Sequence, residues 1–113
     1  MAHQASQLPQ VAFSILLALS LRERHGYEII KQVAADSGGK IKLSPGALYT
    51  SIKQLNLQHL IREIKHEDDP RRRYYRLTDK GRQALGTELD YYQNSLELAR
   101  TRQVWELRHG AAY

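Results

Sequence analysis

Apolar positions recur along the chain at helical spacing, and the first two stretches of this kind indicate a pair of helices. Residues 11–21 are apolar nearly all round, so the first helix is predicted to be a largely buried core element. The pattern breaks at residues 25–26, and a second, amphipathic helix follows that ends at the Ser-Gly-Gly of residues 37–39. Its apolar side comprises Tyr27, Ile29, Ile30, Val33 and Ala34.

The rest of the chain is organised around a third helix. Ser44 can accept a hydrogen bond from a first-turn amide and Pro45 suits the first helical position, so the helix is expected to begin near residue 45. Its buried face comprises Leu48, Ile52 and Leu55. The opposite face carries Ala47, Thr50, Lys53 and Gln54. Such small, hydroxyl, amide and basic side chains suit a major groove, so we interpret the stretch as a recognition helix for duplex DNA. The alternative is an ordinary amphipathic helix with a solvated face.

A β-hairpin is predicted after the third helix. Residues 61–66 and 73–77 have strand composition, and residues 67–72 between them are rich in Asp and Arg with one Pro. Residues 40–43 alternate over too short a stretch to stand alone, and we expect them to pair with the hairpin. The order helix, helix, short strand, helix, hairpin is that of a winged helix-turn-helix, with the hairpin as its wing.

The last predicted helix is the longest. Thr78 or Asp79 can cap it, and neither proline nor a turn cluster follows before about Arg108. Alternating steps of four and three, the spacing of a coiled-coil seam, connect Leu85, Leu89, Tyr92, Leu96 and Ala99. This stripe is about 30 Å long at the usual helical rise, more than so small a domain could cover. We therefore expect a dimerisation helix covered by a partner chain, the alternative being a helix folded back on its own core.

The chain is expected to form one domain with short extensions. We predict a flexible arm at residues 1–8, a winged helix-turn-helix at 9–78, a dimerisation helix at 79–109 and a tail at 110–113. The 113 residues include no cysteine, which fits a reducing compartment. The longest apolar run is shorter than the roughly 20 residues of a membrane span, and no secretory pattern surrounds it. The expectation is a soluble, cytoplasmic protein.

Positive charge is concentrated around the predicted recognition helix. The net charge is +5, and residues 40–82 hold eleven Lys or Arg against five Asp or Glu. The predicted wing carries four arginines, Arg71, Arg72, Arg73 and Arg76. Next to a recognition helix these side chains favour contact with DNA phosphates. The alternative is a solvated face or an ion network with the acidic residues 67–69.

Catalytic and metal chemistry find little support. The five histidines show no metal-ligand spacing, no nucleophile can be paired with a base, and no glycine-rich phosphate loop follows a strand. Residues 66–69, His-Glu-Asp-Asp, could be imagined as a metal cluster, but solvated charge in the wing turn is the better interpretation. We predict a protein without enzymatic activity, metal or cofactor.

Four stretches together resemble the PadR-like family of transcriptional repressors. They are residues 26–30 (Gly-Tyr-Glu-Ile-Ile), 43–49 (Leu-Ser-Pro-Gly-Ala-Leu-Tyr), 60–61 (Leu-Ile) and 72–81 (Arg-Arg-Tyr-Tyr-Arg-Leu-Thr-Asp-Lys-Gly). The resemblance is ordered, extends over about residues 10–100, and is to the short branch with a single C-terminal helix. It implies a mainly α fold with a small β-hairpin wing, a winged helix-turn-helix plus a long C-terminal dimerisation helix. It also implies a homodimeric repressor of duplex operator DNA, released by a small molecule or another cue.

Three positions depart from the family pattern just beyond the recognition helix. The family often has Glu where this chain has Asn56 and usually Gly where it has His59. Histidine can occupy a left-handed C-terminal position at modest cost, so the fold is expected to survive. Leu57, at a place often basic in relatives, is expected to project outward and slightly weaken contacts with the DNA backbone.

These interpretations assign contacts to particular residues. For the major groove we select Thr50, Lys53 and Gln54, and for phosphates Arg71, Arg72 and Arg73. Ser44, Ala47, Arg76 and Tyr49, whose hydroxyl could reach the DNA backbone, complete the predicted surface. The alternative function is a winged-helix module that binds a protein partner or structured RNA.

An effector site is also implied by the resemblance, because relatives hold planar aromatic ligands between dimer helices or in a cavity beside them. The candidate residues along the last helix are Tyr91, Tyr92, Leu98 and Trp105. Plain interface packing is the alternative, since aromatic side chains are generally enriched in interface cores.

Overall fold

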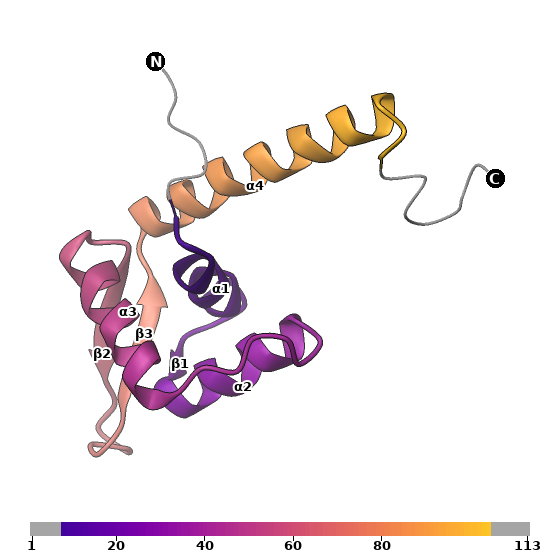
Figure 1. Cartoon of the computed structure of the whole chain (residues 1–113). Helices are drawn as coiled ribbons and strands as arrows, with labels where there is room; N and C mark the ends of the chain where they lie inside the picture. The colour runs from indigo at the N-terminus through magenta and orange to yellow at the C-terminus, as the bar shows by residue number, and fades with distance from the viewer. Residues whose placement is uncertain (1–7, 105–113) are drawn as a thin grey trace.

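Four helices and a small sheet make up the part of the chain that the computed structural model describes, residues 8–104 (Figure 1). In chain order the elements are α1 (Gln10–Leu19), β1 (Arg24–His25), α2 (Gly26–Asp36), α3 (Pro45–Leu57), β2 (Ile61–Lys65), β3 (Arg73–Leu77) and α4 (Asp79–Thr101). The winged-helix architecture and the mainly α fold class predicted from the sequence are confirmed.

The hydrophobic core lies where α1 meets α2, α3, the sheet and the first turns of α4. Ile15 and Leu16 of α1 are fully buried, as are Ile29 of α2 and Leu48 of α3. The prediction that the first helix is a core element is therefore confirmed. It does not extend to the end of the apolar run, because Leu21 follows the helix and is 71% exposed.

The sheet has the strand order β1-β3-β2, and both pairs are antiparallel. The predicted pairing of residues 40–43 with the hairpin is wrong, because β1 occupies that edge of β3 with Arg24 opposite Tyr75. Residues 40–43 form no strand; Leu43 is buried in the core, and the Ile41 amide donates to the Ser37 hydroxyl over 2.9 Å. Their alternation therefore reflects packing of apolar side chains onto the core.

The junction between the hairpin and α4 is tightly closed. Thr78 ends the hairpin and caps α4: its hydroxyl accepts from the Gly81 amide over 3.0 Å and donates to the His59 carbonyl over 2.6 Å. His59 has a φ of 60°, which confirms the left-handed position expected for it. A Cβ on Gly81 would collide with the Leu60 carbonyl, so glycine is needed where α4 passes the start of β2.

The helix α4 has two unequal parts. Its first turns pack on α1, and the rest extends away from the body of the molecule (Figure 1). The helix ends at Thr101, before the predicted end near Arg108, and Gln103 has a left-handed φ of 63°. Leu85 was predicted for the dimer seam but is buried in the core of its own chain, because it lies on the part of α4 that covers α1.

Candidate nucleic-acid interface

The helix α3 presents the predicted polar face to solvent. Its first turn is fixed by Ser44, whose hydroxyl accepts from the Ala47 amide over 3.1 Å, and Pro45 is the first helical residue. Leu48, Ile52 and Leu55 face the core. The six residues selected on this helix and its cap are all exposed: Ser44, Ala47, Tyr49, Thr50, Lys53 and Gln54. This face of α3 is therefore exposed and accessible to a ligand as large as duplex DNA.

Leu57 also behaves as expected, since it is 64% exposed at the end of α3. An apolar side chain at this place adds no positive charge to the surface. The basic character of this surface consequently depends on the wing and on Lys53.

The wing carries the four predicted arginines, and all of them are exposed. Two of them have acidic neighbours: Arg72 Nε lies 3.8 Å from Asp69 Oδ2, and Arg73 Nε lies 3.8 Å from Glu63 Oε2. The ion network considered as the alternative therefore exists in part. Exposed pairs of this kind contribute only about 0–1 kcal/mol, so a phosphate can compete for these guanidinium groups.

The acidic turn of the wing is occupied by internal contacts. The Tyr74 hydroxyl donates to Asp69 Oδ2 over 2.9 Å, and the His66 ring packs edge-on against Tyr74 with centroids 4.3 Å apart. His66 Nε2 lies against the Glu23 carboxylate before β1. In residues 8–104, no group of three or more His, Cys, Asp or Glu side chains is arranged to hold a metal ion.

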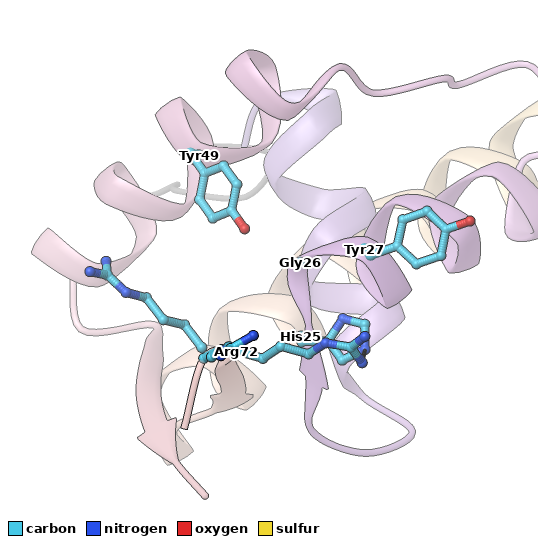
Figure 2. A pocket seen from close by; sticks show the side chains of 7 residues that line it. His25, Gly26, Tyr27, Tyr49 and Arg72 are labelled. Atoms are coloured by element: carbon cyan, nitrogen blue, oxygen red, sulfur yellow. Dashed lines mark hydrogen bonds between the residues drawn. The ribbon is translucent and has the colours of Figure 1, made fainter. Parts of the chain in front are cut away.

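A hollow of about 400 Å³ opens between the start of α2, α3 and the wing (Figure 2). We call it the α2–wing hollow, and it is lined by His25, Gly26, Tyr27, Tyr49, Arg71, Arg72 and Arg73. A Cβ on Gly26 would meet the Tyr49 hydroxyl, so glycine leaves room for this hydroxyl at the start of α2. Three arginines and a tyrosine hydroxyl make this hollow suited to an anion.

Sequence reasoning missed the three residues that line the α2–wing hollow at the start of α2, which are His25, Gly26 and Tyr27. Tyr27 was predicted on the apolar side of the second helix, but it is 67% exposed because it lies on the side of the helix opposite the buried Ile29. His25 was interpreted as a break in the pattern, yet it forms a capping box with Glu28. The signal for this cap was the His-x-x-Glu spacing, which parallels the familiar Ser-x-x-Glu pattern.

Glu28 completes the cap at the start of α2. Its Oε1 accepts from the His25 amide over 3.1 Å, and its Oε2 pairs with Arg22 Nη2 over 3.1 Å. Burial raises the pKa of the Glu28 carboxyl, but the hydrogen bonds from the Arg22 side chain and the His25 amide, together with the positive charge of Arg22, outweigh burial and hold it below its ordinary value. The contacts that lower this pKa also fix the Glu28 carboxyl against the start of α2.

The remaining seam and effector residues lie on the extending part of α4. Leu89, Leu96, Tyr91 and Leu98 are each 42–43% exposed. Ala99 is half-buried. The residues from 105 onward, Trp105 among them, lie outside the described part of the chain.

Tyr92 lies at the boundary between the two parts of α4. Its ring packs edge-on against Phe13 of α1 with centroids 5.2 Å apart, and its hydroxyl donates to Glu88 Oε2 over 3.4 Å. Burial, followed by the Glu88 carboxylate, raises the pKa of Tyr92. A second hollow of about 380 Å³ between α1, α2 and Tyr92 is lined by Phe13, Leu17, Val33 and Ile41 among others. Neither Tyr91 nor Leu98 lines this hollow.

No helix of the described residues has the length and apolar character needed to cross a membrane. No match to the sequence is found among the curated proteins.

Solved structures with the same fold include several regulators. A transcriptional regulator from Clostridium thermocellum is 23% identical with a TM-score of 0.69, and the match covers 80% of this chain and 90% of that one. A PadR family transcription regulator from Clostridium difficile is 22% identical with a TM-score of 0.71, covering 84% and 99%. RosR from H. salinarum is 22% identical with a TM-score of 0.68, covering 94% and 97%.

The family comparison covers most of the chain. Residues 15–87 match the transcriptional regulator PadR-like family, a stretch that contains α2, α3, the whole wing and the start of α4. The chain therefore belongs to the PadR-like family, and it is a DNA-binding transcription regulator with the winged-helix fold.

Proposed function

We propose that the chain is a homodimeric repressor that binds a specific duplex operator through α3 and the wing. The observation that carries this proposal is that arginines of the wing line one hollow together with Tyr49 of α3, the helix whose polar face is exposed. Figure 2 shows Tyr49 and Arg72 at this hollow. One surface thus offers both groove-reading and phosphate-binding side chains. The same interpretation assigns no catalytic role to the chain.

The contacts divide by chemistry. Thr50, Lys53 and Gln54 would contact base edges in the major groove, and Ser44 and Ala47 would lie at its entrance. The wing arginines would bind phosphates, with Arg71, Arg72 and Arg73 lining the same hollow as Tyr49 and Arg76 farther along β3.

Selection of bound sites from random duplex DNA tests this proposal directly. It should yield a two-fold symmetric sequence, because a dimer reads two half-sites. With that duplex, Gln54→Ala should relax preference at one base pair per half-site. Arg73→Ala should weaken all sequences alike and reduce the salt slope of log K by about one unit per lost phosphate contact.

The two variants serve as controls for each other. If Arg73→Ala altered sequence preference while Gln54→Ala left it unchanged, the assigned roles would be reversed. Equal affinity for random and selected duplexes would favour the second candidate, a module that binds a protein partner or structured RNA.

Dimerisation is proposed to use the extending part of α4. Leu89, Tyr92, Leu96 and Ala99 continue the predicted seam, and the exposed leucines have no partner among residues 8–104 large enough to cover them. Leu96→Glu should yield monomer, because an ionised carboxylate in a symmetric seam costs several kcal/mol when unpaired.

Sedimentation of Leu96→Glu measures this effect, and Asn94→Glu is the matched control. Asn94 is exposed on the same helix outside the seam spacing, so the same charge there should leave the dimer intact. A dimeric Leu96→Glu variant would refute the seam. A monomeric variant should keep its fold and lose most operator affinity.

Release by a planar aromatic compound is the last part of the proposal. Tyr92 lines the hollow beside α1. In the sequence, Tyr91, Leu98 and Trp105 recur every seven residues along the same predicted helix. A ligand that lowers operator affinity a hundredfold must favour the DNA-incompatible arrangement by about 2.7 kcal/mol. Trp105 is the single tryptophan, so its fluorescence reports one place.

A panel of planar aromatic compounds should change this fluorescence saturably, and Tyr92→Ala should abolish the change. If the panel produced no saturable change and operator binding were equally unaffected, Tyr92 and Trp105 would be packing residues.

A further inference from the structure

His25 is buried at the bottom of the α2–wing hollow and has both ring nitrogens in use. The residue is 7% exposed. Its Nδ1 accepts from the Glu28 amide over 3.3 Å, which forms half of the capping box of α2. Its Nε2 lies 3.0 Å from Nη1 of Arg72 on the wing.

These two contacts cannot both be hydrogen bonds received by one neutral ring. A neutral imidazole has one lone pair and one N–H. In the tautomer that forms the capping box, Nδ1 accepts from the Glu28 amide and Nε2 carries the hydrogen. The Nε2–H group and the Arg72 guanidinium, which has only donors, then face each other over 3.0 Å.

The groups around His25 do not relieve this arrangement. Glu28 Oε1 lies 3.6 Å from Nε2, beyond hydrogen-bond distance, and already accepts from the His25 amide. Asp69 Oδ2 lies 3.8 Å from Arg72 Nε and so faces another part of the guanidinium. The Tyr74 ring packs edge-on against the His25 ring with centroids 5.3 Å apart. Two donors therefore converge in the hollow without a shared acceptor.

We propose that the α2–wing hollow binds one phosphodiester of the DNA backbone, and that His25 Nε2–H and Arg72 donate to the same phosphate oxygen. An anionic oxygen beside the pair, within hydrogen-bond distance of both nitrogens, would replace the unfavourable approach of two donors with two charge-assisted hydrogen bonds. The hollow of about 400 Å³ also holds the Tyr49 hydroxyl and two further arginines, which supply donors and positive charge. The assignment rests on the proposed DNA-binding function and adds His25 to its contacts.

The geometry gives His25 two separable roles, because each uses a different nitrogen. Asparagine can replace the Nδ1 role, since its side-chain oxygen is a good N-cap acceptor, but it lacks the reach of Nε2. His25→Asn therefore removes the phosphate donor while keeping the cap of α2. His59→Asn is the matched control, because His59 is exposed at a left-handed position that asparagine tolerates.

The experiment measures binding of the full chain to its selected duplex and to a series in which one phosphate at a time is a neutral methylphosphonate. His25→Asn should bind the natural duplex about tenfold to a hundredfold more weakly, the value of one hydrogen bond to a charged group. One methylphosphonate position in each half-site should weaken the natural protein and have little further effect on His25→Asn. His59→Asn should match the natural protein throughout.

Several outcomes would overturn the assignment. One is a His25→Asn variant that keeps its fold and binds the duplex with unchanged affinity. Another is that the loss from His25→Asn and the loss from a methylphosphonate add independently at every phosphate position. Nitrogen NMR shifts that place the hydrogen on Nδ1 of His25 in the free protein would also contradict the donor role. Failure of the natural protein to bind any duplex would instead refute the proposed function.

Titration with inorganic phosphate, followed by NMR of the His25 ring nitrogens, distinguishes two ligands, a phosphate of the DNA backbone and free phosphate. A weak response that duplex DNA displaces agrees with a backbone phosphate as the ligand. A saturable response without coupling to any DNA phosphate would overturn the DNA assignment and identify free phosphate as the ligand. The absence of any response to either would refute the site.

Discussion

The two parts of α4 have opposite relations to the rest of the chain. The first part contributes Leu85 and Glu88 to the interior, and Gly81 lies against the Leu60 carbonyl. The second part leaves Leu89, Leu96 and Leu98 about 42–43% exposed. One uninterrupted helix therefore completes the core of a protomer and then offers an apolar surface beyond it. Heptad spacing continues through both parts, so spacing alone does not say whether a partner is internal or external.

The largest expected effect separates Leu85 from Leu89. Leu85→Ala removes a buried side chain and should lower the free energy of unfolding by about 2–5 kcal/mol at any protein concentration. Leu89→Ala should lower the midpoint of urea unfolding by an amount that depends on protein concentration, because it weakens the proposed association of subunits. Urea titrations at two protein concentrations measure the difference. Concentration-independent losses of equal size would contradict the division of α4.

The next effect compares two glycines of α4. Gly81→Ala places a methyl group against a backbone carbonyl that cannot move aside, and should destabilise the chain by about 1–3 kcal/mol. Gly86→Ala meets no atom of the described residues within 4 Å, so it should stabilise the helix by about 0.5–1 kcal/mol. Thermal unfolding gives both values. Effects of the same sign would show that the junction with Leu60 is not tight.

The smallest effect concerns Tyr92, at the boundary between the two parts. Its pKa is raised above the ordinary value of 10.0 by burial and then by the Glu88 carboxylate. Its contribution to stability is therefore fully present below pH 10 and is lost as the pH rises through the folded-state pKa. Tyr92→Phe should flatten the decline of the unfolding free energy in alkaline solution. The natural protein and the variant are compared by urea unfolding between pH 9 and about 11, where an identical decline for both would contradict this role.

The helices and the wing were predictable because their signals are local. The Ser44-Pro45 start of α3 and the hydrophobic period behind it defined its buried face, and β3 begins and ends at the predicted residues. Ser44, Tyr49 and the rest of the polar surface followed from the same period, since residues opposite a buried face are exposed.

The parts that could not be predicted depend on non-local contacts. The two-residue strand β1 has no periodicity of its own, and only the position of β3 makes it a strand. Leu85 has the same spacing as Leu89, so its burial follows only from the way α4 crosses α1. The role of His25 required the wing and α2 to be seen together, because Arg72 is 47 residues away in sequence.

Thr78 joins β3 to α4, and its contacts have a consequence for the spacing of operator half-sites. Its hydroxyl joins the His59 carbonyl and the Gly81 amide, so the first turns of α4 are fixed to the start of β2. In a dimer held by the far part of α4, the crossing angle of the two helices would determine the distance between the two copies of α3. Half-sites one turn of B-DNA apart require about 34 Å. Adding or deleting one base pair between half-sites would therefore demand a different crossing angle, and the tolerance of the protein for such changes measures the stiffness of α4.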